Sequence, residues 1–310
     1  MGLIRHALLS ASESRFLRER AMRLGFVRRS VSRFMPGEQV DDALASAIAL
    51  KQLGVGAVLT QLGENVTDAS EADRVARHYC DVLARVRERD LDCDISIKLT
   101  QLGLKVDRER CYGNLRLLVE RAKTLSLFVW IDMEQYAYVD DTLALYTRAL
   151  SEFSNVGVCL QAYLYRTSDD LASLIPLGGG IRLVKGAYRE PSNVAYPKRR
   201  DVDENYLALA MRMIATGART VGLRAVFGTH DQRIIGRIQE HAGTTSVPRQ
   251  SFEFHLLFGV QRAEQTRLAS DAYRVRVLIS YGEQWFPWYM RRLAERPANM
   301  LFVVKSLLSN

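Results

Sequence analysis

The chain has 310 residues, of which 48% are hydrophobic and 25% charged, and its formal net charge is +8. This globular composition can bury a large core. No stretch approaches the roughly 20 apolar residues of a membrane-spanning helix, and residues 1–10 lack the long apolar region and cleavage site of a secretory signal. The four cysteines show no CxxC spacing, which favours reduced thiols over a disulfide scaffold. We therefore expect a cytoplasmic protein.

The start of the chain carries most of the positive charge. Residues 1–34 contain eight arginines and two glutamates, so the rest of the chain is almost neutral. Leu17, Leu24 and Val27 lie among the arginines, which predicts a basic helical arm over residues 1–36. Such an arm could bind an anionic membrane surface peripherally or pack on the folded domain as a solvated helix. No nucleic-acid partner is expected, because such proteins more often spread basic and aromatic residues over the folded surface.

After the arm, short β-rich runs alternate with amphipathic helical patterns. Strands are predicted at 56–61, 94–99, 127–133, 157–163, 181–187, 224–229, 252–257 and 275–280. Helical patterns include 69–88, 108–124, 142–153, 204–216, 231–241 and 261–270. Eight strands with intervening helices are typical of a (β/α)8 TIM-type barrel, which would make residues 37–310 one domain. A doubly wound open sheet is the alternative, but no GxGxxG motif follows the first strand.

Charged and polar side chains lie near the carboxyl ends of the predicted strands, where (β/α)8 barrels carry their catalytic groups. Lys98 and Asp132 end the second and third strands, Gln161 lies in the fourth, and Arg182 and Lys185 in the fifth. Charges inside apolar strands cost free energy unless they are paired. Their recurrence on several strands predicts a site rather than one structural salt bridge.

A pair of arginines near the end of the chain has the pattern of an anion-binding group. Glu295 follows Arg291 by four residues and Arg292 by three, so on a helix it could steady both guanidinium groups. Two such groups can bind a carboxylate with paired hydrogen bonds. These residues alone favour a solvated basic face, because surface ion pairs are common and weak. Their place at the end of an alternating β/α chain shifts the interpretation toward a site.

Seven short motifs in this order resemble the proline dehydrogenase family of flavoenzymes. They are SIKL (96–99), IDME (131–134), QAYL (161–164), IRLVKGAY (181–188), THD (229–231), FEF (252–254) and RRLAE (291–295). Each motif alone is weak, but seven in order over about residues 35–310 are specific. The resemblance is to the short monofunctional bacterial form, because no aldehyde dehydrogenase domain follows.

The resemblance implies an activity, a cofactor and partners. The family oxidises L-proline to Δ1-pyrroline-5-carboxylate by hydride transfer to N5 of a non-covalent FAD, and it passes the electrons to a membrane quinone. FAD, a quinone acceptor and a separate pyrroline-5-carboxylate dehydrogenase that takes up the product are therefore expected. No His, Cys or carboxylate cluster has metal-ligand spacing, so no metal is expected.

The resemblance also implies roles for individual residues. Those assigned to the substrate and its support are Lys98, Asp132, Leu257, Arg291, Arg292 and Glu295. Those assigned to FAD are Gln161, Arg182, Val184, Lys185, Gly186, Tyr188, Thr229 and His230. Arg182 would lie near flavin N5, where a positive charge stabilises the reduced anion. Plainer readings stay open for three of them: Gln161 and Leu257 could simply fill the barrel, and His230 could cap a helix.

The sequence departs from the family pattern in the substrate pocket. Leu278 and Trp288 stand where relatives typically have tyrosines, and His255 stands where glutamine is usual. Trp288 could refill the space left at Leu278, or the pocket could accept hydroxyproline or another cyclic imino acid. A flavin-binding barrel without this activity and a Schiff-base lyase that uses Lys98 are further alternatives.

Overall fold

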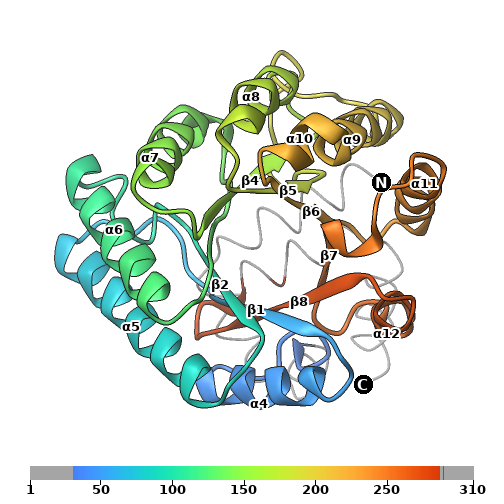
Figure 1. Ribbon diagram of the computed structural model, residues 1–310. Helices are drawn as coiled ribbons and strands as arrows, with labels where there is room; N and C mark the ends of the chain where they lie inside the picture. The colour runs from blue at the N-terminus through green and yellow to red at the C-terminus, as the bar shows by residue number, and fades with distance from the viewer. Residues whose placement is uncertain (1–30, 287–288, 290–310) are drawn as a thin grey trace, which may run out of the picture.

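Eight parallel strands close into a barrel in the order β1 to β8, with β8 pairing with β1. The computed structural model describes residues 31–286 and 289. The strands are β1 Gly56–Gln61, β2 Cys93–Ile97, β3 Val129–Ile131, β4 Val156–Gln161, β5 Gly180–Val184, β6 Arg224–Gly228, β7 Phe252–Leu257 and β8 Arg274–Tyr281. Figure 1 looks down this barrel, whose closure confirms the (β/α)8 prediction and rules out an open sheet.

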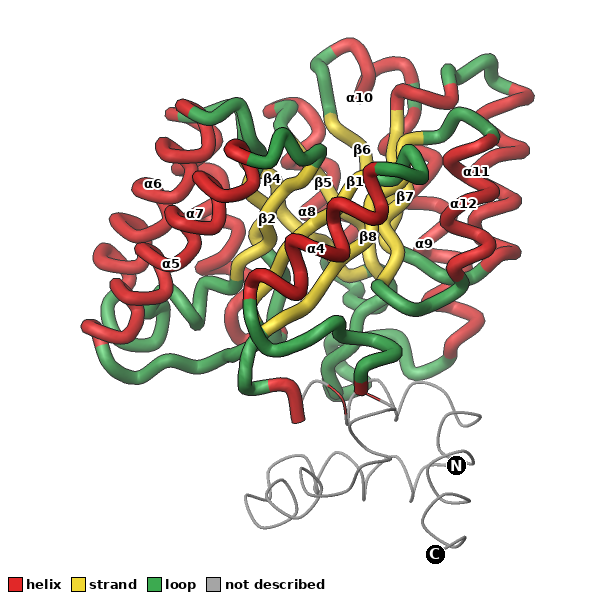
Figure 2. The backbone as a smooth tube through the Cα atoms, turned by 90° about the horizontal axis from the view of Figure 1, so that it is seen from below, coloured by secondary structure: helices red, strands yellow, loops and turns green. Residues whose placement is uncertain are grey.

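Helices cover the outside of the barrel. They are α4 Val40–Lys51, α5 Ala69–Glu88, α6 Arg108–Thr124, α7 Val139–Glu152, α8 Thr167–Leu174, α9 Arg199–Ile214, α10 Thr216–Thr220, α11 Gln232–Thr244 and α12 Arg262–Ser270. Short 3-10 turns lie at Tyr136–Tyr138, Ile175–Leu177 and Arg249–Ser251. Figure 2 shows the strands from the side, with α4 lying across β1 and β8. Among the described residues, no helix is long and apolar enough to cross a membrane.

An aspartate caps the start of α5, α6 and α11, where the sequence changes from loop to amphipathic repeat. Asp68 accepts a hydrogen bond from Ser70 N (2.6 Å) at the start of α5. Asp107 accepts hydrogen bonds from the amides of Glu109 and Arg110 (2.9 and 3.1 Å) at the start of α6. Such caps satisfy amide groups that the first helical turn leaves unpaired. The predicted ranges 69–88 and 108–124 are therefore confirmed to the residue.

Other boundaries differ from the prediction. The run predicted at 127–133 contributes only three paired residues, Val129–Ile131, because the chain leaves the barrel at Asp132. The run predicted at 157–163 ends at Gln161, and a turn leads into α8, an eight-residue helix with no side-chain cap. The helices α4, α8 and α10 were not among the predicted ranges.

One large aromatic side chain fills the middle of the barrel. Trp130 on β3 is fully buried, and its indole Nε1 donates to Oδ2 of Asp94 (2.9 Å). A Cβ atom at Gly157 would lie 2.5 Å from Cζ3 of Trp130, and one at Gly180 would lie 3.0 Å from its Cη2. Glycine on β4 and β5 therefore makes room for the indole, and Trp130 separates the two ends of the barrel interior.

Candidate active site

A buried cluster of ions lies toward the carboxyl ends of β2, β3 and β5. Arg182 on β5 donates from Nη2 to Oδ1 of Asp132 (2.5 Å) and to Oγ of Ser96 (2.7 Å). Ser96 also donates to Asp132 Oδ1 (2.9 Å), while Nζ of Lys98 lies 3.9 Å from Asp132 Oδ2. The side chains of Arg182, Lys98 and Asp132 are 5%, 12% and 20% exposed, so these charges are paired in a poorly solvated place. The sequence predicted all three as site residues, and the fold brings them together.

The remaining contacts of Arg182 fix its orientation. Its Nε donates to Sγ of Cys159 (2.8 Å), and its Cζ lies 5.0 Å from the ring centroid of Trp130. Burial raises the pKa of the Cys159 thiol to about 11, so the thiol is uncharged at neutral pH. The site therefore keeps a cationic guanidinium that is held by three strands.

Gln161, the last residue of β4, is buried with one amide atom unused. Its Nε2 donates to the carbonyl oxygens of Met133 and Glu134 (3.4 and 3.2 Å). Its Oε1 accepts no hydrogen bond from any described residue. The hydroxyl of Tyr163, two residues further on, is likewise buried without a partner among the described residues. Such unsatisfied groups are rare in folded proteins and call for a specific explanation.

The exit of β5 carries the next group of predicted cofactor residues. Val184 ends the strand, and Nζ of Lys185 donates to Asp203 Oδ1 (2.5 Å) and to Asp231 Oδ2 (2.9 Å). Gly186 has a φ of +111°, and a Cβ atom there would overlap the ring of Tyr163. Only glycine fits this backbone. Two carboxylates thus share the charge of Lys185.

Tyr188 lies beyond this turn, and its hydroxyl is 3.4 Å from Oε1 of Glu64, which follows β1. The contact joins the loop after β5 to the loop after β1 across the mouth of the barrel. Tyr188 is therefore at the carboxyl end of the barrel, as the site prediction requires.

The segment after β6 supports β7. Thr229 Oγ1 accepts a hydrogen bond from Asp231 N (3.1 Å), and Asp231 caps α11 by accepting from Arg233 N (3.2 Å). His230 does not make this cap: its Nε2 accepts the amide hydrogen of Leu257 (2.8 Å). His230 thus fixes the backbone of the residue predicted to contact the substrate ring.

Leu257 and Leu278 are register partners on β7 and β8. Leu278 packs inside the barrel against a small cluster formed by Val58, Trp130 and Val226. Leu278, predicted to stand where relatives have a tyrosine, is therefore next to Leu257. Trp288, Arg291, Arg292 and Glu295 lie outside the described residues.

One polar residue of this end was not among the predicted site residues. Glu134 is 3% exposed, and its carboxylate accepts hydrogen bonds from Thr100 N (3.1 Å) and Thr100 Oγ1 (2.5 Å). Burial raises its pKa to about 6, although the bonds from Thr100 and the charge of Lys98 act in the opposite direction. Its place two residues after Asp132 was the available signal.

We expect Glu134→Gln to remove a pH dependence of stability. A carboxyl whose pKa is raised in the folded state is most favourable when protonated, so its contribution is complete below about pH 4.5 and is lost as pH rises through 6. A shift of this size corresponds to about 2 kcal/mol. Urea unfolding of both proteins between pH 4 and 7 measures it: the wild-type stability should fall by that amount relative to the variant. A difference that stays constant with pH would contradict the assignment.

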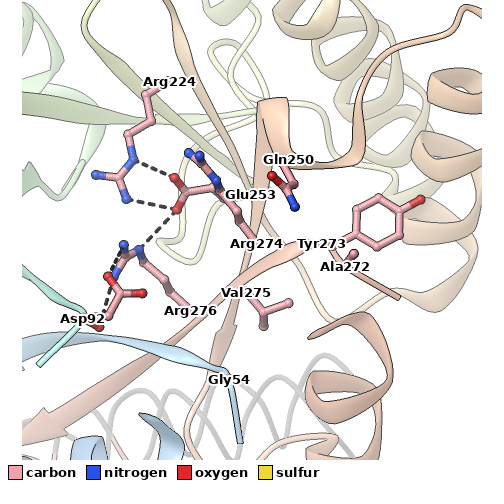
Figure 3. Close-up of a pocket in the computed structure, with 10 residues that line it drawn as sticks. All are labelled: Gly54, Asp92, Arg224, Gln250, Glu253, Ala272, Tyr273, Arg274, Val275 and Arg276. Atoms are coloured by element: carbon pink, nitrogen blue, oxygen red, sulfur yellow. Dashed lines mark hydrogen bonds and ion pairs between the residues drawn. The ribbon is translucent and has the colours of Figure 1, made fainter. Parts of the chain in front are cut away.

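The opposite, amino-terminal end of the barrel holds a cleft of about 660 Å³ lined by charged residues. Figure 3 shows Arg224 and Arg276 converging on Glu253, with Arg276 also bound to Asp92. These charges neutralise one another. This end of a (β/α)8 barrel contributes to stability rather than to catalysis, so the cleft is not our candidate active site. The described residues contain no group of three or more His, Cys, Asp or Glu side chains that could hold a metal ion.

Comparison with known proteins identifies the family. The family model described as proline dehydrogenase matches residues 43–305. The chain is 35% identical over 306 residues to proline dehydrogenase 1 of Bacillus subtilis (strain 168), covering 99% of both chains. It is 36% identical over 281 residues to the proline dehydrogenase of Deinococcus radiodurans, covering 89% of each.

A solved structure shares the fold. Proline utilization A (PutA) from Bdellovibrio bacteriovorus, inactivated by N-propargylglycine, superposes with a TM-score of 0.79 at 22% identity. The match covers 86% of this chain and 32% of that much longer one. With the family match over most of its length, the chain belongs to the proline dehydrogenase family of enzymes.

Proposed function

We propose that the protein oxidises L-proline to Δ1-pyrroline-5-carboxylate with a non-covalent FAD and passes the electrons to a quinone. The observation that carries the proposal is the buried cluster of Arg182, Asp132 and Lys98 at the catalytic end of a barrel in this family. Buried charges are expensive, and removing one partner from such a group is strongly destabilising. A functional use explains why charged residues on β5 and directly after β2 and β3 are brought together here.

The residues present fit a flavin. Gln161 Oε1 is a buried acceptor without a donor among the described residues, and the imide N–H of a flavin ring is a donor of the required kind. Gly186, on the predicted phosphate path, leaves room for the ring of Tyr163 to pack against the backbone after β5. Val184, Lys185, Tyr188, Thr229 and His230 would complete the binding surface. Arg182 supplies a fixed positive charge beside the flavin ring.

In this proposal the chain's own residues bind and orient the substrate. FAD, when bound, supplies the hydride acceptor that leaves a C=N bond in the substrate. Lys98, Arg291 and Arg292 would bind the substrate carboxylate, with Asp132 and Glu295 holding these cations. Leu257 would press on the ring, and its backbone is held by His230. Arg182 favours negative charge that develops on the acceptor side, because its own position is already fixed.

The residues that would contact the substrate ring differ from the family pattern, so they define the identity of the ring less closely than that of the carboxylate. Leu278 has no hydroxyl and is smaller than the tyrosine of relatives, so hydroxyproline or another cyclic imino acid is the alternative substrate. We expect Leu278→Tyr to raise the kcat/KM ratio of proline over ring-substituted prolines by about tenfold, because filling the pocket excludes the added substituent. Steady-state rates on a panel of such substrates measure the ratio. An unchanged kcat/KM ratio after the substitution would contradict the hypothesis that Leu278 determines which ring is accepted.

Flavin spectra test the whole proposal. The purified protein should show flavin absorbance that bleaches anaerobically when L-proline is added, and a quinone analogue should restore it. A protein that binds no added FAD would end the proposal. Bound flavin that no imino acid bleaches would favour a flavin-binding barrel without this activity.

The proposed reaction implies a partner enzyme for its product, and the basic N-terminal residues imply a membrane surface as a second partner. The product would pass to a separate pyrroline-5-carboxylate dehydrogenase. The arginines of residues 1–34 would attract the chain to an anionic membrane surface, where a quinone is available. Sedimentation with anionic vesicles, compared with neutral ones at the same ionic strength, would test the second point.

A further inference from the structure

Residues 31–38 pack against the loops that leave β7 and β8, and we call this segment the N-terminal brace. Val31 and Met35 are 5% and 3% exposed, although the segment precedes the first barrel helix. Gly259, in the loop after β7, has a φ of +73°, and a Cβ atom there would overlap the carbonyl oxygen of Arg33. The brace therefore lies in close contact with the catalytic end of the barrel.

A side-chain hydrogen bond ties the brace to the segment after β8. Nε1 of Trp285 donates to Oε1 of Glu38 (2.9 Å), joining residues 247 positions apart. Trp285, Phe286 and Tyr289 are 4%, 4% and 2% exposed. The ring of Trp285 packs edge-on against those of Phe286 and Tyr289, with centroids 6.0 and 6.1 Å apart. Glu38 thus holds the central ring of a buried aromatic group.

The buried aromatic group directly precedes the two predicted carboxylate-binding arginines in the sequence. Tyr289 precedes Arg291 by two residues and Arg292 by three. The indole N–H of a buried tryptophan needs an acceptor to be stable in one place, and a carboxylate provides a stronger bond than a neutral group. A contact that orients Trp285 therefore also affects Tyr289, whose ring packs against it and which stands two residues before Arg291 in the sequence.

We propose that Glu38, acting through Trp285, is a positioning residue for the arginines that bind the substrate carboxylate. The inference rests on the proposed function, because it takes Arg291 and Arg292 as the carboxylate clamp. It adds a part of the chain outside the barrel motifs to the determinants of substrate affinity. In this role Glu38 acts through Trp285, so its loss should weaken binding and leave the chemical step unchanged.

Three single variants of the full-length, FAD-loaded protein test the proposal. Glu38→Ala removes the acceptor, Trp285→Phe removes the donor but keeps an aromatic ring, and Glu38→Gln keeps an oxygen acceptor without the charge. The readouts are KM and kcat for L-proline, and the Kd, by calorimetry, of a saturated five-membered-ring carboxylate that has no ring nitrogen and cannot be oxidised. Flavin content and the thermal midpoint of each variant report whether it is folded.

Glu38→Ala and Trp285→Phe should each raise KM and the Kd of the carboxylate about tenfold, while kcat changes less than twofold. Glu38→Gln should stay within about threefold of wild type, and the double variant Glu38→Ala/Trp285→Phe should be no worse than either single variant. An unchanged Kd in folded Glu38→Ala, additive losses in the double variant, or a fall in kcat as large as the rise in KM would each overturn the proposal.

The experiments distinguish a failure of the Glu38 proposal from a failure of the proposed function. If the flavin of the wild-type protein bleaches with proline but the Glu38 variants bind the carboxylate with wild-type affinity, only the positioning role of Glu38 is contradicted. If the flavin of the wild-type protein does not bleach with proline and the protein does not bind the carboxylate, the proposed function is contradicted, and the positioning role of Glu38 is contradicted with it.

Discussion

Arg224→Met should lower the free energy of unfolding by about 3 kcal/mol. Arg224 begins β6 and donates from Nε and Nη2 to the two carboxylate oxygens of Glu253 (2.8 and 2.9 Å) and from Nη2 to Asp94 (2.7 Å). Removing one partner of a buried ion pair costs about 3–5 kcal/mol, because the other charge is left without compensation. Arg276 still lies 3.3 Å from Glu253 and 3.5 Å from Asp94, which places the loss at the lower end.

Equilibrium unfolding in urea measures the effect, and another arginine provides a matched control. Arg267 on α12 pairs with Glu264 and Asp271 (both 2.7 Å), but its side chain is 46% exposed whereas that of Arg224 is 21% exposed. Surface pairs contribute about 0–1 kcal/mol. Arg267→Met should therefore cost less than about 1 kcal/mol. Equal losses in the two variants would show that burial does not determine the strength of the Arg224 group.

The same variant separates the two ends of the barrel. If the amino-terminal cluster only stabilises the fold, Arg224→Met should keep the wild-type KM for proline at a temperature where it is fully folded. A rise in KM without loss of folded protein would instead connect the cleft of Figure 3 with substrate binding.

The fold could be predicted from the sequence where local signals agree with one another. The helices α5 and α6 have aspartate caps and basic residues in their last turns, and their predicted ranges match the structure. The helix α8 lacks such agreement, because it has eight residues, no side-chain cap and no basic residue in its last turn. The end of β3 depends on where the chain leaves the barrel, which is a tertiary property rather than a local one.

Three members of the buried ion cluster could be picked out from the sequence, but their contacts could not. Lys98, Asp132 and Arg182 were recognisable because a charge in an apolar strand needs a reason. That Arg182 pairs with Asp132, and that Trp130 lies beneath it, depends on which strands face each other across the barrel. Glu134, the last residue of the IDME motif, was assigned no role, because its burial cannot be read from the sequence.

The N-terminal brace shows a further limit of sequence reasoning. The interpretation of residues 1–36 as a basic arm rested on the arginines before residue 34, whereas within the described part of this range, residues 31–36, the buried side chains are those of Val31 and Met35. Nothing in the local sequence connects Glu38 with Trp285, because the contact joins segments at opposite ends of the chain. Contacts of this separation become visible only when the barrel closes.

Arg182→Met should reduce kcat/KM for L-proline by about 10²–10³, the usual loss when a preorganised electrostatic group is removed from an active site. The guanidinium is buried and oriented by Asp132, Ser96 and Cys159 before any ligand arrives, so no free energy is needed to arrange it during the reaction. Arg182→Lys keeps the charge but loses the planar set of donors, and we expect a smaller loss. Anaerobic stopped-flow reduction of the flavin by proline measures these rates.

Arg182→Met should also destabilise the protein, and a second substitution separates this loss from the catalytic one. Without Arg182, the carboxylate of Asp132 keeps Lys98 at 3.9 Å as its charged neighbour within the described residues. Asp132→Asn in the Arg182→Met background removes the uncompensated charge, so the double variant should recover most of the lost unfolding free energy. Catalysis should stay low, because Arg182 is still missing and Asp132 itself is assigned to the site. If kcat/KM instead returned together with stability, Arg182 would be a structural partner of Asp132 and the electrostatic role proposed for it would be wrong.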